Sequence, residues 1–559
     1  MGNPFTDESG DLLVLDSRDI VDSEIADNVR SIENLGQQQY EQYVKERMLE
    51  RTTPIMDPIK RNNIPLFSRP PPKVSSKATH LSSLKSDCAL FSRLYIASQM
   101  REGDLENFFR HENHAYPPSL SQLGKLRFGT KADLTECLEK LCKPSGEAPV
   151  ADVIILDGAA IVNMLRRVGT KTFQEYATLV FLPYIKAQLR NVSRVDIVWD
   201  MYIQGSLKST AREKRGKGIR RRVTAANTIP GNWQEFLRLD NNKTELFEFL
   251  AHQVVENLST EKEVYTTCGE NVLCTRVNQN VSAMAPCSHE EADTRMFVHA
   301  MDAENRGHRR IVLRTVDTDV LVLAVSNAVR RENTEIWVAF GTGKHFRYIP
   351  AHEIATSLGH DKARALPMFH AFTGCDTVSS FAGRGKKTAF DIWKSFPEVT
   401  PVFITLRETP SSFNEEYMSV LECFVVLLYD RTSSETSVNA ARQHMFSTKA
   451  RSLDGIPPTS AALLQQVKRT VYQGGHIWGQ SHVRVPEVPS PDAWGWKKNA
   501  LHEWEPLWTL LPEAAMSCSE LIKCHCVKGC RGQCKCVKAN LKCTTLCQCR
   551  GDCDHNEGN

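Results

Sequence analysis

The pattern of apolar and polar positions divides the 559-residue chain into four regions. Residues 1–149 are largely polar, with helical patterns in QQQYEQYVKERMLERT and KADLTECLEKL and a proline-marked linker at Arg69–Lys77, so we expect a mostly helical, partly disordered region. From 150 to 399, apolar strands alternate with helical patterns, which predicts a mostly parallel, twisted sheet with helices on both faces. Residues 400–516 are helical in pattern, and residues 517–559 form a cysteine-rich tail. The expected fold class is therefore α/β, with helical flanks and a small metal-binding module.

Aspartates end or interrupt the apolar strands. VIILD ends at Asp157, and VDIVWD ends at Asp200. RRIVLRTVDTDVLVLAV, Arg309–Val325, reads as a strand with Asp317 and Asp319 on one face. Grouped carboxylates repel one another and are costly to bury without a cation, and the carboxyl ends of parallel strands share one crevice. We therefore expect the acids to meet there as metal ligands, although each alone also suits a turn or a helix cap.

A further acidic segment, PCSHEEADTRMFVHAMDA, has the pattern of a helix start. Ser288 and Glu291 match a capping box, which predicts that a helix begins here. Glu291 and Asp293 are candidates for the same crevice if Glu291 lies in the first turn, and Glu290 with Asp293 is the rival pair because residues three apart share a helix face. The alternative is that these acids only favour the positive end of the helix dipole.

A glycine-rich turn lies in GCDTVSSFAGRGKKTAFDIW, Gly374–Trp393. Asp376 opens the segment, and an apolar helical pattern follows the turn. Glycines let a backbone approach a ligand closely, and the first N–H groups of a helix bind phosphate. The candidate phosphate contacts are Gly383, Gly385, Lys386 and Lys387.

Taken in chain order, these motifs resemble the flap-endonuclease and excision-repair family of PIN-like nucleases over Val150–Trp393. The resemblance implies a helix–two-turn–helix-like motif at 374–393 and a centre that uses two Mg²⁺ or Mn²⁺ ions, about 3.5–4 Å apart, to hydrolyse phosphodiesters. The chain departs from the family in having Asp293 where the family has Glu, in the long segment before the first strand, and in the unmatched region between Asp200 and Glu291. The implied catalytic carboxylates are Asp157, Asp200, Glu291, Asp293, Asp317, Asp319 and Asp376.

A basic run, SLKSTAREKRGKGIRRR at Ser206–Arg222, follows Asp200. In the resembled family a basic helical arch stands at this place, which implies that Lys208 and Arg212 meet the scissile phosphate. Their i, i+4 spacing would place them on one helix face. The alternatives are a solvated charged loop and a nuclear-import signal.

Nine of the 18 cysteines lie in the tail, in the pattern CxC-x3-C-x3-CxC-x6-C-x3-CxC-x3-C. Nine thiolates complete about three tetrahedral zinc sites if some of them bridge two ions. The spacing resembles the tesmin-type CXC domain, whose members bind DNA, and metal would supply the folding energy of so short a segment. The interleaved Lys and Arg residues either offset the charge of the cluster or contact DNA, and a disulfide framework is the remaining alternative. The predicted zinc ligands are Cys524, Cys526, Cys530, Cys534, Cys536, Cys543, Cys547, Cys549 and Cys553.

Composition narrows the class of protein. A net charge of +3 gives no strong overall field, 41% hydrophobic residues suit a folded chain, and no apolar run is long enough to span a membrane. We see no signal peptide, so we expect reduced thiols and a nuclear location. His370 and the tryptophans between Trp478 and Trp508 are expected to pack in the core rather than bind ligands.

Two classes of function remain. The first is a metal-dependent, structure-selective nuclease with a zinc-cluster tail that binds DNA, with RNA as a second possible substrate. The second is a non-catalytic DNA-binding protein, either a chromatin protein or a transposon-derived one, in which an inactive PIN-like fold and the cysteine tail bind nucleic acid.

Overall fold

The computed structural model describes most of the chain between Asp104 and Pro512. The described residues are 12, 20–21, 23–59, 95, 104–167, 169–203, 205–209, 218–276, 279–331, 333–449, 452–512, 524, 526, 530, 534, 537, 543 and 548–549. The linker at Arg69–Lys77 and the candidate phosphate contact Arg212 lie outside these ranges, as do Cys536, Cys547 and Cys553 of the tail.

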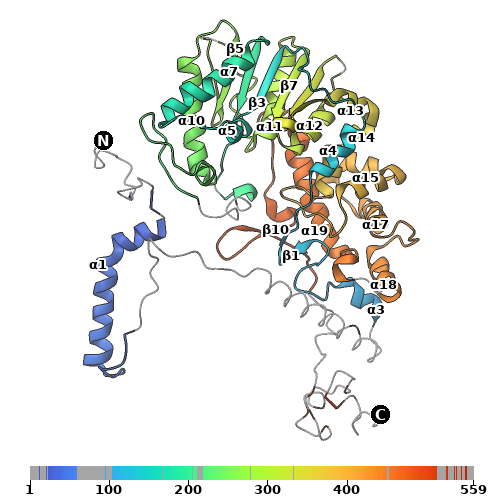
Figure 1. The fold of residues 1–559 in the computed structure, drawn as a ribbon. Helices are drawn as coiled ribbons and strands as arrows, with labels where there is room; N and C mark the ends of the chain where they lie inside the picture. The colour runs from blue at the N-terminus through green and yellow to red at the C-terminus, as the bar shows by residue number, and fades with distance from the viewer. Residues whose placement is uncertain are drawn as a thin grey trace.

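The main sheet has seven strands in the order β6-β5-β4-β3-β7-β8-β9. In Figure 1 its strands β3, β5 and β7 lie in the upper part of the view, with the helices α17 (Glu415–Tyr429), α18 (Val438–Lys449) and α19 (Ser460–Val471) below them. Its five inner strands are mutually parallel, and the two edge strands, β6 and β9, are antiparallel to their neighbours. This confirms the expected α/β fold with a mostly parallel sheet. The strands are β3 (Val153–Asp157), β4 (Arg194–Val198), β5 (Glu263–Cys268), β6 (Asn271–Cys274), β7 (Arg310–Thr315), β8 (Glu335–Phe340) and β9 (Arg347–Pro350).

Helices pack on the sheet over two separate apolar cores. Along β3, side chains alternate between them, with Val153 and Ile155 in one core and Leu156 in the other. The helices on the Leu156 side are α5 (Gly158–Met164), α6 (Phe173–Tyr176), α7 (Leu182–Leu189), α9 (Trp233–Phe236) and α10 (Asp240–Asn257). Those on the Val153 side are α11 (Ala292–Asn305), α12 (Thr318–Ala328) and α13 (Ala351–Leu358).

The segment Arg309–Val325 is not one strand, which corrects the sequence prediction. Strand β7 ends at Thr315, and α12 begins at Thr318. Asp317 is the N-cap of this helix, and its Oδ1 accepts a hydrogen bond from the Asp319 N–H at 2.9 Å. Every residue of α12 is buried, so the helix has no polar face and its apolar run cannot be told from a buried strand by periodicity.

The region after the sheet is helical, as its pattern predicts. It adds a small hairpin, and Trp478, Trp496, Trp504 and Trp508 are all buried, as expected for packing residues. The elements are α14 (His360–Phe372), α15 (Lys386–Ser395), α16 (Val399–Glu408), α17 (Glu415–Tyr429), α18 (Val438–Lys449), α19 (Ser460–Val471), β10 (Trp496–Lys498) and β11 (Trp504–Pro506).

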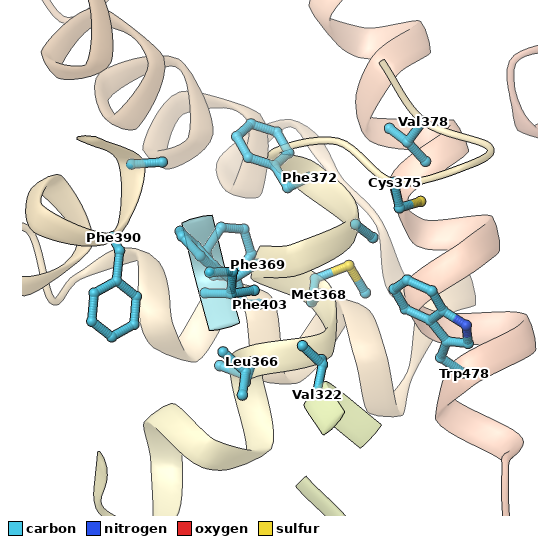
Figure 2. Close-up of a cluster of buried hydrophobic side chains, with 14 of the residues drawn as sticks. Val322, Leu366, Met368, Phe369, Phe372, Cys375, Val378, Phe390, Phe403 and Trp478 are labelled. Carbon is cyan, nitrogen blue, oxygen red and sulfur yellow. The ribbon is translucent and has the colours of Figure 1, made fainter. Parts of the chain in front are cut away.

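Helix α14 joins this helical region to the sheet. Figure 2 shows Phe369 and Phe372 of α14 among Phe390, Phe403 and Trp478, with Val322 of α12 nearby. The ring of Phe369 stacks on that of Trp393 at a centroid distance of 4.5 Å. Because one apolar core runs from Phe108 to Trp508, residues 104–149 and 400–512 pack on the same core as the sheet.

The described part of the amino-terminal region contains the helices expected from its pattern. Helix α1 (Ser23–Tyr43) continues as a π-helical turn at Val44–Leu49, and α4 (Ala132–Glu139) corresponds to KADLTECLEKL. Between them lie α3 (Leu105–Arg110) and a hairpin of β1 (Ser121–Gln122) and β2 (Lys125–Leu126). Helix α4 packs against α12 and α15, next to the carboxyl ends of the strands. Among the described residues, no helix has the length and apolarity needed to cross a bilayer.

Candidate active site

The carboxylates predicted from β3 and β4 lie at the ends of these strands. Asp157 is the last residue of β3 and the N-cap of α5, and its two oxygens accept hydrogen bonds from the Ala160 N–H at 2.9 Å and the Thr315 hydroxyl at 3.2 Å. Asp200 follows β4, and its Oδ1 accepts a hydrogen bond from the Ala292 N–H at 2.8 Å. Both carboxylates are thus held in place by the first turns of helices.

Helix α11 begins three residues later than the capping-box pattern predicts. Its N-cap is Glu291 rather than Ser288, and the Asp200 carboxylate supplies the capping bond. Because Glu291 lies outside the helix and Asp293 within its first turn, the two acids do not have the divergent directions of residues i and i+2 in a helix. Glu290, the rival candidate, accepts a hydrogen bond from the Ser206 hydroxyl at 2.6 Å.

Asp317 and Asp319 lie beside Asp293, and carboxylate oxygens of the three acids lie within 4.8 Å of one another. Oxygen atoms of three carboxylates at this spacing could hold a hard divalent ion. Asp376, in the loop after α14, joins the same cluster through Lys131, whose Nζ is 2.8 Å from Asp376 Oδ1 and 2.9 Å from Asp319 Oδ2. All seven predicted carboxylates therefore surround one rim of the sheet.

The seven acids can be grouped by their position and contacts. The β3–β4 group is Asp157 and Asp200, which lie at the ends of these strands, with Glu291, whose neighbour Ala292 donates a hydrogen bond to Asp200. The β7 group is Asp317, Asp319 and Asp376, which all contact Lys131. Asp293 lies between the groups, since charges from both act on its carboxylate.

Burial and mutual repulsion raise the pKa values of four of these acids, Asp157, Glu291, Asp293 and Asp317. Burial, with the nearby Asp200 charge, raises the pKa of Asp157 to about 7. Burial also raises the pKa of Glu291 to about 7, although Lys208 opposes the shift. The pKa of Asp317 is raised to about 6 by burial and by Asp319, and that of Asp293 is raised well above its ordinary value. Such shifts mean that the ionised cluster is destabilised until a cation joins it.

Lys208, the first lysine of the basic run, contacts the acidic cluster. Its Nζ is 2.5 Å from Glu291 Oε1 and 3.8 Å from Asp376 Oδ2, and the side chain is largely buried. The ammonium therefore lies between the two groups of acids, where a phosphate bound at the rim would meet it.

The turn before α15 differs from its prediction at one residue. Gly385 is the N-cap of α15, and Gly383, Gly385 and Lys387 are exposed. Lys386 instead is buried, and its Nζ donates hydrogen bonds to the His370 carbonyl at 2.8 Å and the Thr373 hydroxyl at 2.9 Å. Burial lowers the pKa of Lys386 to about 7. Its role is therefore to hold α14 and α15 together, because a helix-facing, buried amine cannot reach a phosphate at the surface.

Two residues contact the acids of the site although the sequence analysis did not predict that they would. Lys131, the first residue of the helical pattern KADLTECLEKL, contacts Asp317, Asp319 and Asp376 from the segment before the sheet. His370 packs as expected, stacked on Trp478, but its Nε2 also lies 2.8 Å from Asp319 Oδ1. Burial lowers the pKa of His370 well below its ordinary value, so the neutral ring donates this bond and fixes the carboxylate.

The described cysteines of the tail form a second candidate metal centre. The Sγ atoms of Cys524, Cys530, Cys534 and Cys543 lie within 4.8 Å of one another. The Sγ of Cys524 is 3.5 Å from that of Cys530 and 3.8 Å from that of Cys543. Four thiolates around one zinc ion with Zn–S bonds of about 2.3 Å have sulfurs about 3.8 Å apart, so the four residues suit a tetrahedral zinc site.

Comparison with known proteins gives only distant likenesses. No protein-family model matches the chain, and no curated protein matches its sequence. Among solved structures, the T5 D15 protein co-crystallised with metal ions is 12% identical, with a TM-score of 0.27, over 57% of this chain and 95% of that chain. The catalytic core of Rad2 in complex with DNA substrate is 11% identical, with a TM-score of 0.29, over 60% of this chain and 99% of that chain. Both TM-scores are below 0.5, so the function of the rim has to be inferred from its side-chain geometry.

Proposed function

We propose that the chain is a divalent-metal-dependent nuclease that hydrolyses phosphodiester bonds of nucleic acid at the rim of the sheet. The observation that supports this most is the convergence of seven carboxylates, from segments 219 residues apart at the extremes, on one rim of a parallel sheet. A structural ion network would pair each acid with a base, whereas Asp157, Asp200 and Asp293 have no ion pair with any described residue.

The residues present fit magnesium or manganese. All seven donors are carboxylates, the hard oxygen ligands that these ions prefer. Several are fixed before any ion binds: Asp157 by Ala160 and Thr315, and Asp319 by His370. The raised pKa values of Asp157, Asp293 and Asp317 show a negative charge that a divalent cation would relieve. A bound ion would lower the pKa of a water molecule and stabilise the leaving oxygen.

The chain's own residues position the substrate and the ligands. The Lys208 ammonium, between Glu291 and Asp376, would bind a non-bridging oxygen of the scissile phosphate and offset its charge. The first N–H groups of α15, with the exposed side chain of Lys387, would bind a phosphate farther along the nucleic acid strand. His370 and Thr315 act through the carboxylates that they orient, and so are positioning residues.

DNA is the proposed substrate, with the zinc-bearing tail as a second DNA contact and the nucleus as the location. The basic run at 206–222 supports a polyanionic substrate, because its net positive charge lies directly after a candidate metal ligand. The spacing of the nine tail cysteines supports a CXC-type cluster of about three zinc ions.

The test incubates the purified full chain with flap, hairpin and single-stranded DNA, and with the matching RNA, in Mg²⁺, in Mn²⁺ or in a chelator. We expect cleavage only with a divalent ion, and a loss of about 100-fold or more in Asp319→Ala. Asp361→Asn is the matched control, since Asp361 is an exposed aspartate at the far end of α14. An inactive wild type, or unchanged cleavage by Asp319→Ala, contradicts the proposal.

One observation favours the non-catalytic alternative. Lys131 and Lys208 already form ion pairs within the cluster, and in a protein without activity such pairs would only stabilise the rim. In that case the chain binds DNA equally well with and without divalent ions and cleaves none of the substrates. A binding measurement in chelator, made beside the cleavage assay, separates the two functions.

A further inference from the structure

Lys131 reaches the β7 group of acids from a segment that precedes the sheet by more than twenty residues. It lies at the start of α4, and its Nζ is 2.8 Å from Asp376 Oδ1, 2.9 Å from Asp319 Oδ2 and 3.5 Å from Asp317 Oδ1. A lysine ammonium has three N–H donors and no acceptor, so one side chain serves three carboxylates. Lys131 thus contacts every member of the β7 group.

The position of this ammonium is fixed by the packing of α4. Only 21% of the Lys131 side chain is exposed. One turn along the helix, the Thr135 hydroxyl is 3.0 Å from the Thr318 hydroxyl at the start of α12, and α4 also packs on α15.

The contacts of Lys131 join the two acids that a second ion would bridge. Its Nζ lies beside Asp319 Oδ2 and Asp376 Oδ1, while the other oxygen of Asp319, Oδ1, is bonded to His370. Magnesium binds carboxylate oxygens at about 2.0–2.1 Å and requires near-octahedral geometry, so an ion that bridged these two oxygens would have to displace the ammonium. Lys131 has no ion pair with Asp293 or with the β3–β4 group among the described residues.

We propose that Lys131 is a built-in cation that takes the place of a second divalent ion between Asp319 and Asp376, so that the centre binds a single ion, held by Asp293, Asp317 and Asp319. This inference rests on the proposed metal-dependent function and changes one of its expectations, since the family resemblance implies two ions. The segment 104–149 then belongs to the catalytic unit, because it supplies one of the two positive charges of the centre.

The test counts Mn²⁺ ions bound to the zinc-loaded full chain by titration calorimetry and by electron paramagnetic resonance. We expect one tight Mn²⁺ in the wild type, with the signal of an isolated ion, and two in Lys131→Met, with the signal of a spin-coupled pair. Lys131→Arg keeps the charge and should bind one. Lys125→Met, at an exposed lysine of β2, is the control and should also bind one. Asp293→Asn gives the background from sites elsewhere in the chain.

The outcomes separate this inference from the proposed function. Two Mn²⁺ ions in the wild type would overturn the role of Lys131 and leave the metal-dependent nuclease intact. One ion in a folded Lys131→Met variant would also overturn it. No Mn²⁺ above the Asp293→Asn background in the wild type would remove the metal centre, and with it the proposed function. Two ions in the wild type overturn the inference even if the Lys131→Met variant does not fold, and in that case Lys131→Ala, which also removes the ammonium, replaces it in the count.

Discussion

The two candidate metal centres differ in what assembles them. The carboxylate rim is built by the sheet: Asp157 and Asp200 are fixed by backbone N–H groups, and a core that runs from Phe108 to Trp508 supports the elements around them. Among the few tail residues that the structure describes, the buried ones form a small cluster of Cys524, Cys534 and Cys543. The rim should therefore exist before its ion binds and lose stability from its own charge, whereas the tail should depend on its metal to fold.

Removal of zinc should unfold the tail, residues 517–559, and leave residues 104–512 folded. This is the largest effect that we expect. Structural zinc contributes roughly 10–16 kcal/mol to small domains of this kind. With a zinc-selective chelator, limited proteolysis of the full chain should cut within residues 517–559 and leave 104–512 intact, with release of about three zinc ions. Release of one zinc ion or none would contradict the prediction. Proteolysis of residues 104–512 together with the tail would also contradict it.

The pH dependence of stability should reveal the charge of the rim. The folded pKa values of Asp157 and Glu291 are about 7, above their unfolded values near 4, so the folded protein binds more protons in this range. Stability in chelator should therefore increase as the pH falls from about 7.5 to 5, by a few kcal/mol. Saturating Mg²⁺ should flatten this dependence. Thermal unfolding followed by circular dichroism measures both, and a stability that falls with acid in chelator would contradict the prediction.

Lys386 should give stability a smaller pH dependence, of the opposite sign to that of the acids. Its folded pKa of about 7 lies below the unfolded value near 10.5, so the unfolded chain binds more protons between these limits and stability rises with pH there. Lys386→Met should remove this rise, which is on the order of 2–4 kcal/mol. Lys387→Met, at the exposed neighbour, should keep it. Denaturant unfolding at pH 7 and pH 9.5 gives the change in unfolding free energy for each variant. An equal change in Lys386→Met and Lys387→Met would contradict the assignment of the pH dependence to Lys386.

Substitution of Lys387 should have the smallest effect, and it should alter only the affinity for DNA. Because its side chain is exposed at the start of α15, Lys387→Gln should leave the unfolding midpoint unchanged and lower the slope of log affinity against log salt by about one. Fluorescence anisotropy with labelled DNA at several salt concentrations measures this slope. An unchanged slope would mean that the nucleic acid backbone does not contact Lys387 and crosses another part of the rim.

The sequence was sufficient to predict the sheet and the residues at its strand ends. VIILD and VDIVWD are short apolar runs that end in an aspartate, and both became strands whose final acids reach the rim. The prediction was wrong at α12, because a helix with every side chain buried has no periodicity that separates it from a strand. The start of α11 was misplaced by three residues because Asp200, distant in the chain, supplies its cap in place of Ser288.

Lys131, His370 and Lys386 could not be assigned from the sequence because their roles depend on packing between distant segments. Lys131 reaches the acids only when α4 is placed against α12, and His370 meets Asp319 only when α14 crosses the same helix. Lys386 belongs to a turn whose composition suits phosphate binding, and only the contact with α14 buries it. Local composition predicted the type of residue at the rim, while tertiary packing decided which side chains point into it.

The acids that cap helices would be retained for a reason unrelated to chemistry. Asp157 and Asp317 each complete the first turn of a helix, and Asp200 does the same for α11, so substitution of any of them by alanine costs about 1 kcal/mol of folding free energy even in a copy with no activity. Asp293 lies inside a helical turn and caps none. If the proposed hydrolysis were lost in a related protein, Asp293 would therefore be the first of these four aspartates to be substituted. Its identity, more than that of the capping aspartates, would distinguish active copies from decayed ones.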